Sequence, residues 1–191
     1  YKNNMKNIVY YNSFQNKNIT LPSVFKKDRP KKFFFFGDSF ADLHKERSFS
    51  WTLKVSDHFN ATAFNWGMGG ASEQSIFYTF AKTVNEERDF TFIFHTHPHR
   101  SDKFFNSKSL PMTSSFFKKW DEMITFPCLH LYWADYSYQF TNGKTLLCSF
   151  DFQSIETCPE DCIHHMTIED NYLFSEQVID KVTDMLNHKK T

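Results

Sequence analysis

The stretch KFFFFGDSFAD, residues 32–42, decides the fold of this chain. Four consecutive Phe residues cannot alternate between a buried and an exposed face, so they predict a strand that helices cover on both sides. The strand stops at Gly37-Asp38-Ser39, whose residue types favour a tight turn. Because open α/β sheets bind ligands at the carboxyl ends of their strands, the sequence predicts that Ser39 presents its hydroxyl at a ligand-binding edge.

Strand-like and helix-like segments alternate along the rest of the chain. After Ser50, the apolar residues Trp51, Val55 and Phe59 recur every four positions, which is typical of a helix face behind a serine N-cap. We expect strands at 32–36, 61–66, 89–95, 128–133 and 146–150, and helices at 50–60, 71–87, 113–124 and 167–188. This alternation predicts an α/β fold, a three-layer α/β/α sandwich on a mostly parallel, flavodoxin-like sheet.

The domain organisation is simple. Residues 1–30 are rich in Asn and Lys and show neither a strand period nor a helix period, so we expect an N-terminal arm or packing extension there. Residues 31–191 fit one domain, and an α/β domain of this size can bury a core without metal or disulfide links. The chain opens with Tyr1, so one expectation is a processed piece of a longer protein.

Charge and cysteine usage narrow the partners but leave the compartment unknown. The chain carries 22 basic and 22 acidic residues, and its net charge is therefore zero. A net charge of zero gives no reason to expect nucleic acid or an anionic membrane as a partner. Neither a stretch of about 20 apolar residues nor a signal-peptide pattern is visible. Four cysteines allow three disulfide pairings or free thiols, and the sequence does not choose among them. They are Cys128, Cys148, Cys158 and Cys162.

Three further blocks follow the serine turn in chain order: NWGMGGAS at 65–72, FTFIFHT at 90–96 and DCIHHMT at 161–167. With the serine turn, they resemble the SGNH (GDSL-type) hydrolase family over roughly residues 31–187. The resemblance implies the SGNH hydrolase fold, a serine esterase site and no cofactor.

The resemblance also implies roles for particular residues. Ser39 matches the nucleophile, and the C-terminal block supplies a base and its orienter, Asp161. Two histidines compete for the role of base. The three-residue spacing from Asp161 selects His164, whereas the spacing back from the expected helix start at Thr167 selects His165. We favour His165, because the helix start fixes where its imidazole points while the preceding loop can absorb one more residue.

Backbone amides are the expected oxyanion donors, since they are oriented before the negative charge develops. They are the N–H of Ser39 and that of a glycine in the second block. We favour Gly69 over Gly67, which could instead supply a positive φ.

The third block departs from the family pattern. Where the family has an Asn donor, this chain has HTHPHR at 95–100, similar to a variant third block of virus-encoded relatives. Thr96 or His97 could replace the missing donor, and Arg100 could hold an anionic part of a substrate. Alternating histidines in this block could suggest a metal face, but we expect hydrogen-bonding roles and no metal.

Two functions follow from these observations. The first is a serine hydrolase of carboxylic esters, an O-acetyl esterase acting on a small-molecule or carbohydrate ester. The alternative is a catalytically inactive SGNH-fold protein that serves as a binding or structural part of a viral particle or surface assembly. The altered third block and the N-terminal arm, which could contact a larger assembly, motivate this alternative.

Overall fold

The computed structural model describes residues 8–10, 31–41, 50–96, 114–132, 140–147 and 168–187, with only the backbone of residues 8–10. The strands in these ranges are β1 (Ile8–Tyr10), β2 (Lys31–Gly37), β3 (Ala61–Gly67), β4 (Phe90–Phe94), β5 (Cys128–Tyr132) and β6 (Lys144–Leu147). The helices are α1 (Trp51–His58), α2 (Glu73–Thr83), α3 (Ser114–Glu122) and α4 (Ile168–Asn187). Strands and helices alternate from β2 to β5, as the sequence predicts, and β6 follows β5 with no described helix between them.

The strands form one sheet in the order β1-β3-β2-β4-β5-β6, and every neighbouring pair is parallel. From β3 to β6 this is the flavodoxin-like order, which confirms the predicted sheet. From β2, the next strand β3 is added on one side of the sheet, whereas β4, β5 and β6 are added on the other side. Open α/β sheets bind ligands at such a switch point, which here lies between β2 and β4. The serine turn directly follows β2.

Strand β1 was not expected, because residues 1–30 show no strand period. It pairs with the outer edge of β3, with Ile8 beside Ala63 and Tyr10 beside Asn65. Backbone hydrogen bonding along an open sheet edge needs no particular side chains, which is why the sequence pattern does not reveal it. The other residues of the expected arm lie outside the described ranges.

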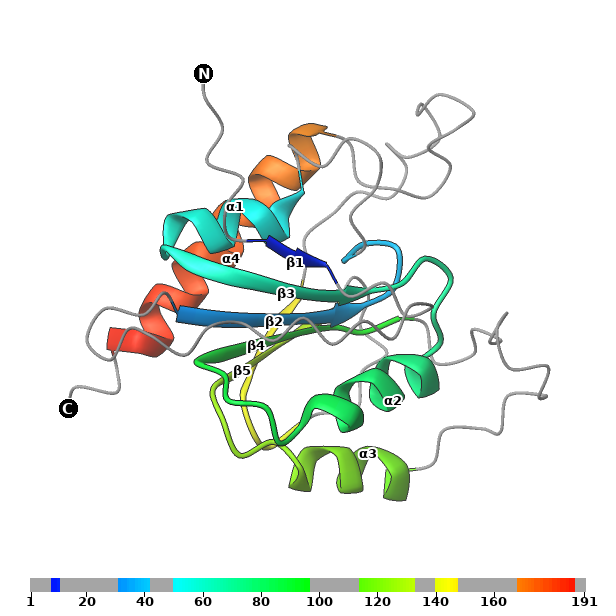
Figure 1. Cartoon of the computed structure of the whole chain (residues 1–191). Coiled ribbons are helices and arrows are strands. Elements are labelled where there is room, and N and C mark those ends of the chain that lie inside the picture. The colour runs from blue at the N-terminus through cyan, green and yellow to red at the C-terminus, as the bar shows by residue number, and fades with distance from the viewer. Residues whose placement is uncertain are drawn as a thin grey trace.

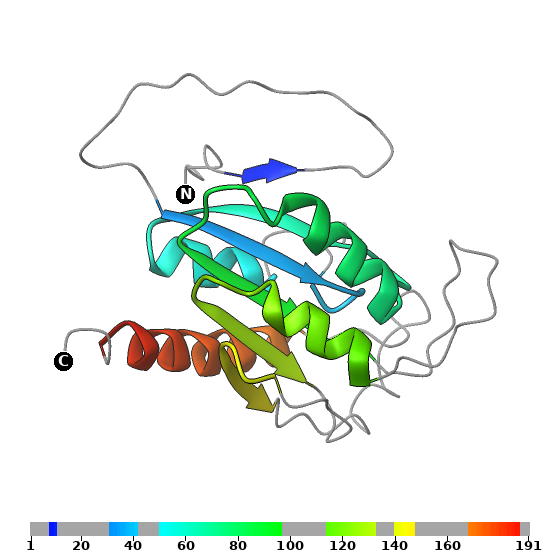
Figure 2. The ribbon, with the colours of Figure 1, turned by 90° about the horizontal axis from the view of Figure 1, so that it is seen from below.

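Helices cover both faces of the sheet, α1 and α4 on one side and α2 and α3 on the other (Figure 1; Figure 2, from below). The Phe run of β2 serves both layers, because successive strand side chains point to opposite faces. Phe33 and Phe35 pack in the cluster with α1 and α4, whereas Phe34 and Phe36 pack in the cluster with α2 and α3. The two-sided burial predicted from this run is confirmed.

Each helix turns a stripe of apolar residues toward the sheet. Trp51 and Val55 of α1 are buried, as are Phe174, Val178 and Val182 of α4. The four-residue spacing of these sets places their members on one helix face. None of the described helices is both long and apolar enough to cross a membrane.

Some element boundaries differ from expectation. Strand β6 starts at Lys144, two residues before the expected start, and its side chains are mostly exposed, so burial leaves no clear pattern there. Ser50 is the N-cap of α1 as predicted, but its hydroxyl bonds Thr52 Oγ1 at 2.8 Å and not a helix N–H. Helix α1 ends before Asn60, whose φ of 49° cannot continue a right-handed helix.

Candidate active site

Three of the four sequence blocks meet at the carboxyl edge of the sheet. Strand pairing puts Gly37, at the end of β2, beside Gly67, at the end of β3. The N–H of Met68 then donates to the carbonyl oxygen of Gly37 at 3.1 Å. On the other side, β4 pairs with β2 and leads directly into Thr96. The serine turn, the glycine turn and the start of the third block are therefore neighbours.

Asp38 braces the serine turn from within, as the sequence predicts. Its Oδ1 accepts the N–H of Phe40 at 3.0 Å, and its carbonyl oxygen accepts the N–H of Ala41 at 3.1 Å. The side chain is 0 % exposed, whereas Ser39 is 9 % exposed. Asp38 thus uses Oδ1 and its carbonyl oxygen within the turn, and Ser39 is the more exposed residue of the pair.

Gly37 is required for space. A Cβ atom at this position would lie 2.8 Å from Cβ of Ala41 and 2.8 Å from Cβ of Phe94. The strand and the returning turn can approach each other this closely only without a side chain. The glycine before the serine therefore sets how tightly the chain folds back behind Ser39.

Two buried side chains hold the far side of the serine turn. The Trp51 indole Nε1–H donates to the carbonyl oxygen of Phe40 at 2.8 Å, and the Asn65 amide Nδ2 donates to that of Ala41 at 2.8 Å. These groups come from α1 and β3, elements that the buried core fixes. The turn carrying Ser39 is thus anchored from two elements besides its own.

In the glycine turn, Gly67 and Gly70 have roles that differ in part from those expected from the sequence. The N–H of Gly67 donates to Oδ1 of Asn65 at 2.7 Å, which ties that amide up. The positive φ considered for Gly67 occurs instead at Gly70, with φ 80°. Gly70 is the third residue of a turn that the Ala71 N–H closes onto the Met68 carbonyl at 3.0 Å, and this position favours glycine.

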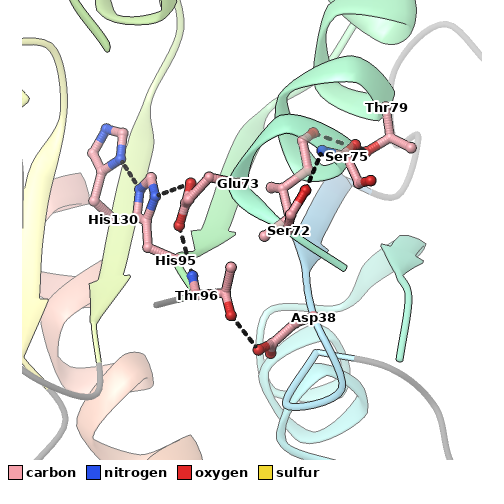
Figure 3. Close-up of polar contacts among 9 residues, drawn as sticks. Asp38, Ser72, Glu73, Ser75, Thr79, His95, Thr96 and His130 are labelled. Carbon is pink, nitrogen blue, oxygen red and sulfur yellow. Dashed lines mark hydrogen bonds and ion pairs between the residues drawn. The ribbon is translucent and has the colours of Figure 1, made fainter. Parts of the chain in front are cut away.

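Thr96 uses both of its donors inside the protein. Its hydroxyl donates to Oδ2 of Asp38 at 2.9 Å, and its N–H donates to Oε1 of Glu73 at 2.6 Å (Figure 3). An oxyanion donor must be aimed at the reacting carbonyl, and in this arrangement both Thr96 donors are aimed at carboxyl oxygens. Thr96 therefore links the third block to the serine turn.

Sequence reasoning missed Glu73, the first residue of α2. Its Oε2 lies 3.1 Å from Nδ1 of His95, and Nε2 of His95 lies 2.9 Å from Nδ1 of His130 (Figure 3). Nε2 of His130 lies 3.0 Å from the carbonyl oxygen of Asn142. An acidic residue in the first turn of a helix is common on protein surfaces. The sequence therefore offered only one clue to the role of Glu73, which is its place at the start of the helix that follows the glycine turn.

Burial dominates the protonation of this chain of groups. It raises the pKa of Glu73 to about 8, although the hydrogen bond from the Thr96 N–H works in the opposite direction. It lowers the pKa of His95 to about 3 and that of His130 to about 3, the latter also because of His95. At neutral pH these directions favour an uncharged acid and two uncharged imidazoles.

The expected base and its orienter lie outside the described residues, and so do several other candidates. They are Asp161, His164, His165, His97 and Arg100. Helix α4, which follows these expected residues, is connected to the serine turn through Trp51. Asn171, in the first turn of α4, accepts the Trp51 N–H at 3.2 Å, and the indole of Trp51 holds the carbonyl of Phe40.

The cysteines and histidines form no metal site within the described ranges. Cys128 is a buried free thiol, and burial raises its pKa, so it is unreactive. The other three cysteines lie outside the described residues.

This chain has the SGNH hydrolase fold. Two solved structures of esterase-like proteins share that fold at low sequence identity. Psychrotrophic esterase EstA from Pseudoalteromonas sp., in a structure inhibited by monoethylphosphonate, is similar at TM-score 0.55 and 12% identity, covering 82% of this chain and 99% of EstA. A Desulfitobacterium hafniense protein assigned to the lipolytic G-D-S-L family is similar at TM-score 0.52 and 15% identity, covering 78% of this chain and 98% of that one. No protein-family model and no curated protein matches the sequence.

Proposed function

We propose that this protein is a serine hydrolase of carboxylic esters with Ser39 as its nucleophile. The observation that carries the proposal is the position of Ser39: it lies at the switch point of the sheet, in a turn that Asp38, Trp51 and Asn65 hold, and it is 9 % exposed. A fixed hydroxyl at this place suits nucleophilic attack on a bound acyl group. The shared fold of the two esterase-like structures agrees with it.

In the proposed mechanism, His165 takes the proton of the Ser39 hydroxyl while the oxygen attacks the ester carbonyl. Asp161 orients the imidazole, and the N–H groups of Ser39 and Gly69 stabilise the tetrahedral oxyanion. The intermediate collapses to an acyl-enzyme, the alcohol leaves with the proton from His165, and water then releases the acid. The link from the start of α4 through Trp51 to the serine turn supports a base just before α4.

We further propose a small acyl group, an acetyl ester of a carbohydrate, as the substrate. Equal numbers of acidic and basic residues suit a neutral substrate, and the sequence blocks resemble those of a family with acetyl-removing members.

One observation favours a second candidate, a binding protein that keeps the fold without turnover. Thr96, at the start of the altered third block, has both of its donors turned inward onto Asp38 and Glu73. A site with only two oxyanion donors would stabilise the transition state less.

Hydrolysis of 4-nitrophenyl acetate separates the two candidates. We expect turnover by the unmodified protein and a loss on the order of 10³-fold in kcat in Ser39→Ala. Ser114→Ala, the same change at an exposed position on α3, serves as the matched control and should leave the rate unchanged. His164→Ala and His165→Ala identify the base, because the variant with the greater loss has lost it.

A phosphonate ester probe gives a second readout that does not need turnover. An activated serine attacks the phosphorus and displaces its leaving group, so mass spectrometry should find one adduct on Ser39 and none in Ser39→Ala. Equal background rates for the unmodified protein and Ser39→Ala, both folded and both unlabelled, would contradict the hydrolase proposal and favour the binding role.

A further inference from the structure

A continuous series of hydrogen bonds, buried as far as His130, connects the serine turn to β5 and the segment before β6. It runs from Asp38 through Thr96, Glu73 and His95 to His130, and it ends at the carbonyl oxygen of Asn142. The side chains come from the ends of β2 and β4, the first turn of α2 and the middle of β5 (Figure 3). The hydrolase mechanism assigns no role to Glu73, His95 or His130.

The carbonyl oxygen of Asn142, at the end of this series of hydrogen bonds, determines which group donates and which accepts in each bond. A carbonyl oxygen only accepts, so Nε2 of His130 carries a hydrogen and donates it to Asn142. In a neutral His130 the other nitrogen, Nδ1, accepts, and therefore Nε2 of His95 donates to it. In a neutral His95 the remaining nitrogen accepts from Glu73.

This direction leaves the carboxyl of Glu73 with one donor and one acceptor. Its Oε2 carries the proton for His95, and its Oε1 accepts the N–H of Thr96. In the alternative arrangement the proton lies on Nδ1 of His95, so that Glu73 is a carboxylate beside a His95 imidazolium. His95 is 1 % exposed and stacks on Tyr132 with ring centroids 4.5 Å apart, and such surroundings disfavour separated charges. Burial also raises the pKa of Glu73 to about 8, which agrees with the neutral form.

We propose that Glu73 is a positioning residue that acts as a neutral carboxylic acid. Its O–H is fixed by His95 and its carbonyl oxygen holds the Thr96 N–H, so the Thr96 hydroxyl stays aimed at Asp38 and the third block keeps its spacing from the serine turn. Glu73 touches no reacting atom. The kinetic consequence rests on the proposed function, whereas the protonation does not.

The charged and titratable groups near this chain are few. Within the described residues, Asp38 forms the end of the series at the serine turn, Tyr132 stacks on His95, and Asp121 of α3 acts on His130 through its charge. The carboxylate of Asp121 itself accepts hydrogen bonds from Thr141 and Asn142. None of these groups supplies a cation that would pair with an ionised Glu73.

Glu73→Gln tests the proposal most directly, because an amide reproduces the pattern of a neutral acid. The NH₂ group can donate to His95 and the oxygen can accept from Thr96. We expect Glu73→Gln to keep kcat for 4-nitrophenyl acetate within about threefold of the unmodified protein. Glu73→Leu leaves the Thr96 N–H without its acceptor and should lower kcat by at least tenfold with little change in KM.

Two results would overturn the proposal. If Glu73→Gln loses as much activity as Glu73→Leu, the exchangeable proton itself is needed and the positioning role is wrong. If Glu73→Leu is as active as the unmodified protein, the link to Thr96 does not matter. Thr96→Val, which removes only the hydroxyl that reaches Asp38, keeps the test intact should Glu73→Leu fail to fold, and it should lower kcat in the same direction.

A measurement without substrate separates this proposal from the hydrolase assignment. Nitrogen NMR of the unmodified protein at pH 7 should find His95 and His130 as neutral imidazoles with the hydrogen on Nε2, and infrared spectra should contain the carbonyl stretch of a buried carboxylic acid that Glu73→Gln lacks. An imidazolium signal from His95 would refute the neutral acid even if the esterase is active. If these signals appear in a protein without esterase activity, the neutral acid stands and the hydrolase assignment fails.

Discussion

The two faces of the central strands differ in kind. Toward α1 and α4, the buried side chains of β2, β4 and β5 are all apolar, and the faces toward α2 and α3 mix apolar with polar residues. The first set is Phe33, Phe35, Phe90, Phe92, Phe94, Leu129 and Leu131. Alternating with them on the second face, and just past its strands, are the polar residues Thr91, His95 and His130.

The two faces of the sheet therefore contribute differently to stability and to the site. Dense aromatic packing against α1 and α4 gives stability and has no hydrogen-bonding requirements. The opposite face holds the chain from Glu73 to His130, where every group needs a specific partner. We therefore expect substitutions on the first face to act through lost packing, and those on the second face through orphaned polar groups.

The largest effect should come from Phe92→Ala on the apolar face. Phe92 is 0 % exposed and stacks on Phe35 with ring centroids 4.6 Å apart. Removing its ring loses burial and leaves a cavity, so we expect the free energy of unfolding to fall by about 3–5 kcal/mol. Urea titration measures this, with Phe116→Ala, half-buried on α3, as the matched control that should lose clearly less. Equal losses at the two positions would mean that the apolar face is not the stabilising one.

On the polar face, His95→Leu should cost about 2–4 kcal/mol although it keeps a side chain of similar size. Glu73 loses the acceptor of its proton and His130 loses its donor, and each buried group left unpaired costs about 1–3 kcal/mol. The same change at the exposed His58 is the control and should stay within about 0.5 kcal/mol. A His95→Leu protein as stable as the unmodified one would show that the polar face is held by packing alone.

Buried apolar elements could be predicted from the sequence, whereas elements held mainly by backbone pairing could be predicted only in part. The Phe run, the glycine before Ser39 and the helix stripes predict the layers and the sheet type, because burial leaves a periodic trace in the sequence. Strand β1 and the edge strand β6 leave little trace, since they depend on backbone pairing more than on buried side chains.

The candidate site was predictable where it depends on local geometry. Gly37 and Asp38 serve Ser39 within one turn, and the role of Asp38 was foreseen. The chain from Glu73 to His130 was not, because it joins residues 22 and 35 positions apart through hydrogen bonds that only the packed fold brings together. The roles expected of Asp161, His164, His165, His97 and Arg100 stay predictions, since these residues lie outside the described ranges.

The pH dependence of stability also distinguishes the two faces, because Glu73, His95 and His130, which are buried and have strongly shifted pKa values, lie on the polar side. A pKa of Glu73 raised from 4.5 to about 8 means that the folded protein holds a proton that the unfolded chain releases above pH 4.5. That stabilisation is full below 4.5 and is lost as pH rises toward 8. The imidazoles of His95 and His130, lowered from 6.5 to about 3, act oppositely and lose their contribution as pH falls from 6.5 toward 3.

Together the three groups place the stability maximum near pH 6.5. From there to pH 8 one proton separates the two states, so the free energy of unfolding should fall by up to about 1.4 kcal/mol per pH unit. Urea titrations of the unmodified protein and Glu73→Gln at several pH values isolate this contribution, because all other groups are shared. A parallel decline in the two proteins would mean that Glu73 does not hold the proton.

The smallest effect should come from Thr91→Val, one residue before Phe92 on the same strand. Among the described residues, the Thr91 hydroxyl is buried without a hydrogen-bond partner, unlike Glu73, His95 and His130 on the same face. Replacing it by a methyl group of similar shape removes a desolvated polar atom, so stability should stay level or rise by about 0.5–1 kcal/mol. Urea titration decides the sign. A loss above about 1 kcal/mol would mean that the hydroxyl has a partner, and that the polar face uses each of its polar groups in the same way.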